Sequence, residues 1–145
     1  MKYSIQYFGR VLAAFALSSA ANVALAETVV IVAATNPVTA LTADQAADLF
    51  LGRATSFPSG GDATPIDQAD GSAMRDDFYT KVANKSGPQV KAYWAKLVFT
   101  GKGQAPKDAG DSAGVKSAVV ANPGAVGYVD KSVVDGSVKV VLSLH

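Results

Sequence analysis

Apolar positions along residues 27–145 fall into short continuous runs that are separated by segments with helical spacing. Residues 28–34, T-V-V-I-V-A-A, form an unbroken run rich in β-branched side chains. Such a run predicts a strand that is buried on both faces. Shorter runs at residues 64–68, 125–129 and 137–142 predict three further strands.

Four segments between these runs carry helix signals. Thr42-Ala43-Asp44-Gln45 is a capping box that opens a helix ending at Gly52. A second helix is predicted from Ser72 to about residue 83, and Asp111-Ser112 caps a fourth that stops before residue 122. The third begins at Ser86-Gly87-Pro88 and carries the largest apolar face in the chain, formed by Val90, Tyr93, Trp94, Leu97 and Val98.

Strands that alternate with helices predict an α/β fold with a mixed sheet flanked by helices on both faces. In such sheets, ligands bind beyond the carboxyl ends of strands, where the following helices begin. Residues 70–75 lie between a predicted strand and a predicted helix, so they occupy a position of this kind.

This turn has the chemistry of an anion site. Its Gly-Ser pair precedes a helix, where unpaired backbone N–H groups and the positive end of the helix dipole favour negative charge. Arg75 lies three residues after Ser72, on about the same helix face, and its guanidinium suits phosphate or carboxylate. The predicted ligand-binding residues are Asp70, Gly71, Ser72, Ala73, Met74 and Arg75.

The same residues have a purely structural interpretation. A Gly-Ser pair before a helix is ordinary capping, and Arg75 can pair with Asp70 or Asp76. In an anion site, Asp67 or Asp70 can accept a proton from hydrogen phosphate and so select it over sulfate.

The first 26 residues read as a secretory signal peptide. Lys2 and Arg10 supply a basic region, residues 11–21 are apolar, and Ala24-Leu25-Ala26 is a cleavage pattern. We therefore expect a periplasmic domain of residues 27–145. The mature chain would keep 11 of the 13 basic residues against 12 acidic ones, and this near-balance argues against nucleic acid and against a polybasic membrane surface.

The sequence gives no support for an enzyme. Its single histidine is the last residue, His145, and it has no cysteine and no Gly-x-Ser-x-Gly elbow. Asp67 and Asp70 do not have the spacing of a calcium loop. We expect no catalytic residues, no metal site and no cofactor.

Several stretches, taken in order, resemble one family. They are residues 29–34 leading into Asn36-Pro37-Val38, Leu41-Thr42, Leu49-Phe50-Leu51-Gly52-Arg53, Pro65-Ile66-Asp67, Gly71-Ser72-x-x-Arg75-x-x-Phe78, Tyr93-Trp94, Phe99-Thr100-Gly101-Lys102-Gly103 and Asn122-Pro123-Gly124-Ala125-Val126-Gly127-Tyr128-Val129. Together they are similar to phosphate ABC transporter substrate-binding proteins, and in particular to their short, single-lobe relatives.

The resemblance implies one lobe of a type II periplasmic-binding-protein fold. It also implies binding of inorganic phosphate, or a similar oxyanion, for uptake through an inner-membrane permease. The family's Gly-Ser-Gly-Thr-Arg-like turn reads Gly71-Ser72-Ala73-Met74-Arg75 here, so the threonine hydroxyl is missing. A single lobe would leave the anion half exposed, and a second copy of the chain, as a homodimer, is one way to cover it.

A secreted interaction module without a ligand is the alternative. Lys96, Lys102 and Lys107 flank the loop at residues 99–106 and can dock an acidic partner, although a solvated lysine-rich loop accounts for them better.

Overall fold

The protein is described by a computed structural model that covers residues 26–145. The predicted signal peptide, residues 1–26, lies outside the described residues except for Ala26. Among the helices of the described part, none is long and apolar enough to cross a membrane.

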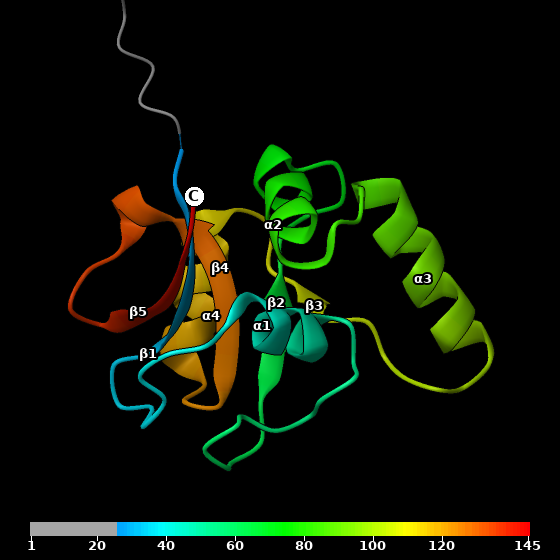
Figure 1. The fold of residues 1–145 in the computed structure, drawn as a ribbon. Helices are drawn as coiled ribbons and strands as arrows, with labels where there is room; N and C mark the ends of the chain where they lie inside the picture. The colour runs from blue at the N-terminus through cyan, green and yellow to red at the C-terminus, as the bar shows by residue number, and fades with distance from the viewer. Residues whose placement is uncertain (1–25) are drawn as a thin grey trace, which may run out of the picture.

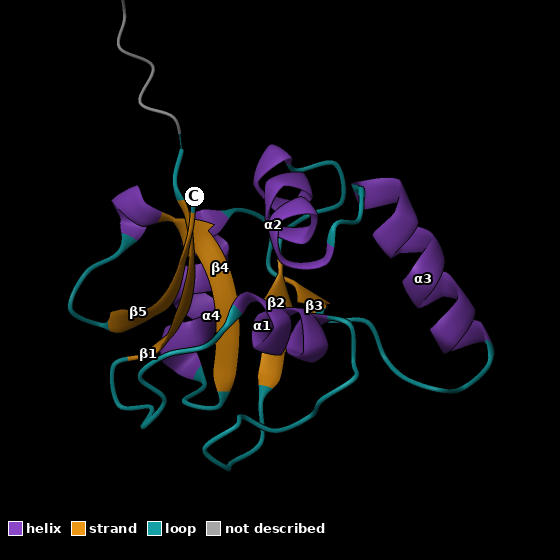
Figure 2. Ribbon diagram, viewed as in Figure 1, coloured by secondary structure: helices purple, strands orange, loops and turns teal. Residues whose placement is uncertain are grey.

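Five strands form one mixed sheet in the order β3-β2-β4-β1-β5 (Figures 1 and 2). Strand β2 is parallel to β3 and β4, and β1 is antiparallel to β4 and β5. The strands are β1 Thr28–Ala33, β2 Thr64–Asp67, β3 Lys107–Asp108, β4 Ala125–Asp130 and β5 Val138–Leu144. The predicted mixed sheet is therefore confirmed. The two-residue β3 was not predicted, because only its pairing with β2 makes it a strand.

The helices begin close to where the capping signals place them. They are α1 Ala43–Phe50, α2 Ala73–Ala83, α3 Gly87–Phe99 and α4 Ser112–Ala121, with a short 3₁₀ helix η1 at Lys131–Val133. Thr42 and Ser86 form complete capping boxes, and Ser72 and Asp111 cap α2 and α4 through their side chains.

Both faces of the sheet are covered, as predicted. Helix α4 packs on one face, where Val115 and Val119 join a cluster with β1 and β4. Helices α1 and α2 cover the other face (Figure 1). There, Phe78 stacks on Tyr128 with ring centroids 4.0 Å apart, and Phe50 meets both rings edge-on.

The large apolar face predicted for α3 is only partly buried. Val90 and Trp94 are buried, Tyr93 and Leu97 are half-buried, and Val98 is 53% exposed. The helix lies to one side of the sheet and packs mainly against α2, so its last turn has no layer to cover it (Figure 1). Periodicity identified the helix correctly but overstated how much of its face is buried.

Trp94→Ala should destabilise the fold by roughly 3–5 kcal/mol, because it removes a large aromatic side chain that is only 6% exposed. The matched control is Val98→Ala on the same helix, which should change stability by only about 0.5 kcal/mol. Chemical denaturation of both variants checks this. Equal stabilities would mean that Trp94 is not part of the core.

Candidate functional site

The candidate site lies at the edge of the sheet where the parallel strands β2, β3 and β4 reach their carboxyl ends. Helices α2 and α4 begin at this edge, and Gln68, the residue after β2, ties their first turns together. Its buried amide donates to Ser112 Oγ and to the Tyr128 carbonyl, each at 3.1 Å, and accepts from Ser72 Oγ at 3.1 Å. Two helix N-termini are thus held beside one strand end.

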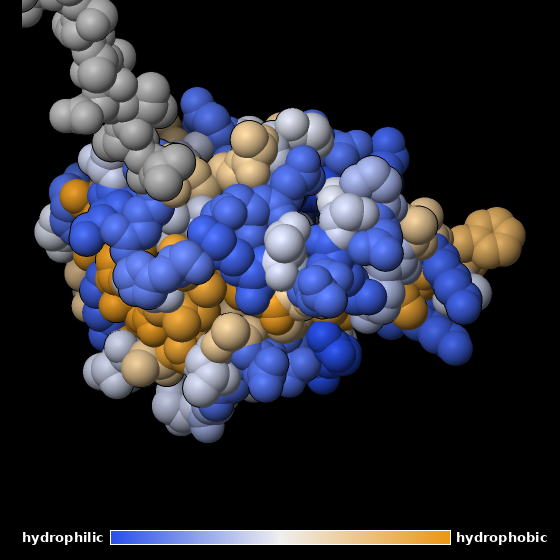
Figure 3. Space-filling model, turned by 45° about the horizontal axis from the view of Figure 1, so that its top comes forward, coloured by the Kyte–Doolittle hydropathy of each residue, from blue (hydrophilic) through white to orange (hydrophobic). Residues whose placement is uncertain are grey.

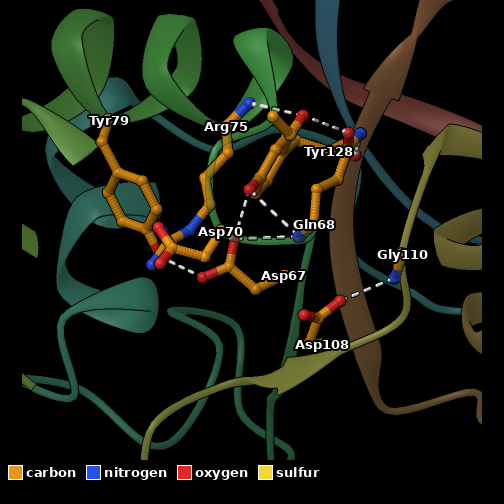
Figure 4. A network of polar contacts seen from close by, with 9 residues as sticks. Asp67, Gln68, Asp70, Arg75, Tyr79, Asp108, Gly110 and Tyr128 are labelled. Carbon is orange, nitrogen blue, oxygen red and sulfur yellow. Dashed lines mark hydrogen bonds and ion pairs between the residues drawn. The ribbon is translucent and has the colours of Figure 1, made fainter. Parts of the chain in front are cut away.

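The last residue of β2, Asp67, is a carboxylate buried at the centre of a polar network (Figure 4). It accepts hydrogen bonds from the hydroxyl of Tyr79 at 2.7 Å, from the hydroxyl of Tyr128 and from the Gln68 N–H at 2.9 Å. Arg75 Nε lies 3.5 Å from Asp67 Oδ1. These contacts use nearly all of the carboxylate's capacity to accept, so Asp67 has a structural role.

Arg75 is held between two carboxylates. The residue is only 8% exposed; its Nη1 donates to Asp70 Oδ1 at 3.0 Å, and the guanidinium lies 5.5 Å from the centre of the Tyr79 ring. Burial is the largest single influence and opposes its charge, but Asp67, followed by Tyr79, Tyr128 and Asp70, together outweigh burial and raise the pKa of Arg75. Arg75 Nε is buried without a hydrogen-bond acceptor among residues 26–145.

Asp70 is the exposed member of the group. Its second oxygen lies 3.0 Å from Lys91 Nζ of α3, so one carboxylate joins two cations. The hydrogen bond and charge of Lys91, followed by the charge of Arg75, lower the pKa of Asp70. These side chains open into a pocket of about 230 Å³, which is lined by Asp67, Gln68, Asp70, Arg75, Lys91, Trp94, Ala105, Pro106 and Asp108.

The turn before α2 is built as the sequence predicts. Gly71 has φ +84°, a conformation that side chains rarely adopt, and the space where its Cβ would lie is open. Ser72 Oγ accepts from the Arg75 N–H at 3.3 Å, which makes Ser72 the N-cap, while its own proton goes to Gln68. The Ser72 hydroxyl is therefore already engaged.

The predicted ligand residues do not all reach the pocket with their side chains. Asp70 and Arg75 line it, whereas Gly71, Ser72 and Ala73 do not. Met74 turns away, and its sulfur accepts from Thr28 Oγ1 at 2.9 Å. The backbone N–H of Ser72 is also engaged, since it donates to the Ala69 carbonyl at 3.0 Å. The groups left to offer an anion are therefore backbone N–H groups at the start of α2, those of Ala73 and Met74.

Sequence reasoning missed four members of the network, namely Gln68, Tyr79, Lys91 and Tyr128. The two tyrosines left a weak signal, because a tyrosine on an apolar face needs a partner for its hydroxyl. Lys91 left none, since only the packing of α3 beside α2 brings it to Asp70.

No protein-family model matches the sequence, and no curated protein matches it. Solved structures, however, do match it. A crystallised protein from Clostridium perfringens, assigned to the phosphate ABC transporter substrate-binding proteins and holding bound phosphate, is 30% identical, with a TM-score of 0.61 over 80% of this chain and 44% of its own. The chain is a short relative of that family.

Two other members of this family of structures share the fold at lower identity. An ABC-type phosphate transport receptor from Vibrio cholerae is 21% identical with a TM-score of 0.62, and PstS from Borrelia burgdorferi is 12% identical with a TM-score of 0.60. The chain covers 45% and 46% of these proteins, so it spans less than half of its relatives' length. The resemblance and the lobe-like fold predicted from the sequence are confirmed.

The buried tyrosines predict how stability depends on alkaline pH. Burial first, and the charge of Asp67 second, raise the pKa of Tyr79 and of Tyr128 above the usual 10.0. A pKa that is higher in the folded state means that these groups contribute full stability below about pH 10 and lose it as pH rises further.

We therefore expect the Cζ NMR signals of Tyr79 and Tyr128 to stay those of the neutral phenol until alkali unfolds the protein. Tyr79→Phe, which removes one donor to Asp67, should shift the unfolding transition seen by circular dichroism. Ionisation of either tyrosine in the folded protein would contradict the network.

Proposed function

We propose that this protein is a periplasmic solute-binding protein that binds inorganic phosphate, or a similar oxyanion, at the N-terminus of α2 and delivers it to an ABC permease for uptake. Support comes from the family relationship and from the relative crystallised with bound phosphate. The proposed ligands are Arg75 and Lys91, which line the pocket, and the backbone N–H groups of Ala73 and Met74 at the start of α2.

One observation carries this proposal: the pocket already coordinates an anionic group. Arg75 and Lys91 each approach a different oxygen of Asp70 at 3.0 Å, from two different helices. A phosphate offers the same kind of oxygens, and charge-assisted hydrogen bonds to it are shorter and stronger than neutral ones.

The same geometry limits affinity. Three carboxylates and two cations line the pocket, so an incoming anion must compete with Asp70 for the guanidinium and the ammonium. Water also reaches the Asp70 side chain, which is 54% exposed, and it weakens each charged contact. We expect a dissociation constant on the order of tens of micromolar to millimolar.

A ligand-free interaction module remains the second candidate. It is favoured by the fact that Asp67 and Asp70 already neutralise Arg75, which then needs no external anion. Titration calorimetry with phosphate separates the two candidates. Saturable heat supports the solute-binding protein, and no heat at millimolar phosphate supports the module.

Arg75→Ala should weaken phosphate binding by about one to two decades, because a charge-assisted hydrogen bond at a largely buried site contributes roughly 1.5–3 kcal/mol. It should also lower the melting temperature, since Asp67 loses its buried counter-charge. Arg53→Ala is the matched control, because Arg53 is an exposed arginine that pairs with Asp48 outside the pocket.

Lys91→Gln separates binding from folding in this test. The Lys91 side chain is 72% exposed, so its replacement should weaken phosphate binding with little change in melting temperature. Wild-type affinity in both Arg75→Ala and Lys91→Gln, measured on folded protein, would remove these residues from the site.

Asp70→Asn should reduce the preference for phosphate over sulfate by about tenfold. Asp70 faces the pocket, can accept a proton from hydrogen phosphate and repels sulfate, whereas the hydrogen bonds that Asp67 already accepts leave it little capacity for another. Asp108→Asn is the control: it removes the same charge from the pocket lining, but Asp108 accepts from the Gly110 N–H and pairs with neither cation. An unchanged phosphate-to-sulfate ratio in Asp70→Asn would refute this role.

A further inference from the structure

Charge is segregated strongly along the chain. Residues 78–107 contain six lysines, no arginine and no acidic residue. Lys81 pairs with Asp77 and Lys91 pairs with Asp70. The remaining four form no ion pair with any residue from 26 to 145, and they are Lys85, Lys96, Lys102 and Lys107. The mature chain is therefore nearly balanced in charge as a whole, but α3 and the loop that follows it form a basic region.

An apolar tip lies inside this basic region. Phe99, the last residue of α3, is 93% exposed, and the neighbouring Val98 is 53% exposed. Lys96 lies one turn before Phe99 on the same helix face, and Lys102 follows in the turn. Figure 3 shows apolar atoms projecting at the edge of the molecule with hydrophilic atoms beside them.

The end of α3 is firmly capped, so the exposure of Phe99 is not caused by fraying. The Lys102 N–H donates to the Leu97 carbonyl at 2.9 Å, and the Gly101 N–H donates to the Val98 carbonyl at 3.1 Å. This is a Schellman motif, and Gly101 supplies the left-handed conformation that it needs, with φ +69°. The fold thus holds the backbone of Phe99 in place and leaves its ring exposed to the surroundings.

We infer that the tip of α3, comprising Lys96, Val98, Phe99 and Lys102, is a docking site for the anionic surface of a phospholipid bilayer. The ring and the valine would enter the interfacial region, while the lysine ammonium groups stay at the level of the lipid phosphates. This inference does not depend on the proposed anion pocket.

The use of lysine, and not arginine, favours a lipid surface over an acidic protein as the binding partner of this region. Protein interfaces are enriched in arginine and depleted in lysine, yet this region contains only lysine. Lysine is a strongly hydrated point charge, which suits diffuse attraction to a charged surface and not a fitted pairing. A lone projecting ring also needs no complementary pocket in a fluid bilayer.

The test is co-sedimentation of the protein with phospholipid vesicles at low and high salt. One set contains phosphatidylcholine alone, and the other contains one part phosphatidylglycerol to two parts phosphatidylcholine. We expect binding to the anionic vesicles only, and its loss at high salt, because surface attraction falls off within about a Debye length.

Two pairs of variants separate this surface from the rest of the molecule. Lys96→Gln with Lys102→Gln should weaken binding by roughly 10- to 30-fold, since each lysine near the surface contributes about fivefold. The control, Lys131→Gln with Lys139→Gln, makes the same change of charge on η1 and β5, on the opposite side of the molecule from α3 (Figure 1). Phe99→Ser should weaken binding by about tenfold, and Val140→Ser, at the exposed Val140 of β5, is its control.

Phe99→Trp gives a direct readout of insertion, because its emission should shift to the blue on anionic vesicles while the buried Trp94 stays unchanged. Equal effects of the α3 variants and their controls would overturn the inference, as would an unshifted emission from bound protein. Failure of the wild type to bind either kind of vesicle would also overturn it.

Discussion

The buried carboxylate of Asp67 is the interaction on which the candidate site depends. A charge placed at the end of a central strand is costly unless it is paired and hydrogen-bonded, and here the partners come from two other elements, α2 and β4. Tyr79 and Arg75 reach it from α2, and Tyr128 reaches it from β4. The need to satisfy one anion therefore fixes how α2 is rotated against the sheet.

That rotation determines what α2 presents to the pocket. With Tyr79 and Arg75 turned toward Asp67, Phe78 stacks on Tyr128 and Met74 is directed to Thr28. The polar and apolar contacts of α2 are thus parts of one arrangement. Arg75 is consequently pre-positioned for an anion, but Asp70 already neutralises part of its charge. The free energy gained on binding phosphate would therefore be only the difference between the interaction of Arg75 with phosphate and its interaction with Asp70.

Most of the fold could be predicted from the sequence because its signals are local. The capping residues Thr42, Ser72 and Asp111 and the β-branched run of β1 act within a few positions of themselves. The site was predictable only where it is local too, at Asp70 and Arg75. Lys91 and Tyr128 reach it by way of tertiary packing, 21 and 58 residues after Asp70, and no pattern along one chain carries that information. Exposure of Val98 was missed for the same reason, since helical spacing identifies a face but not what covers it.

Helix α3 connects the proposed anion pocket with the proposed membrane-docking tip. The distance between them along the helix determines whether a bilayer at the tip would disturb anion binding in the pocket. Lys91 belongs to the pocket and Phe99 to the tip, and eight residues of α-helix separate them by about 12 Å. An anionic bilayer at the tip attracts the lysines but repels a phosphate ion near it. At physiological salt the Debye length is about 8 Å, so most of that repulsion is screened at the distance of the pocket. The same spacing keeps Lys91 with Asp70 while Lys96 and Lys102 remain free to face a surface. One rigid helix can therefore serve an anion pocket at one end and an anionic surface at the other, because the distance between them exceeds the range over which their charges interact.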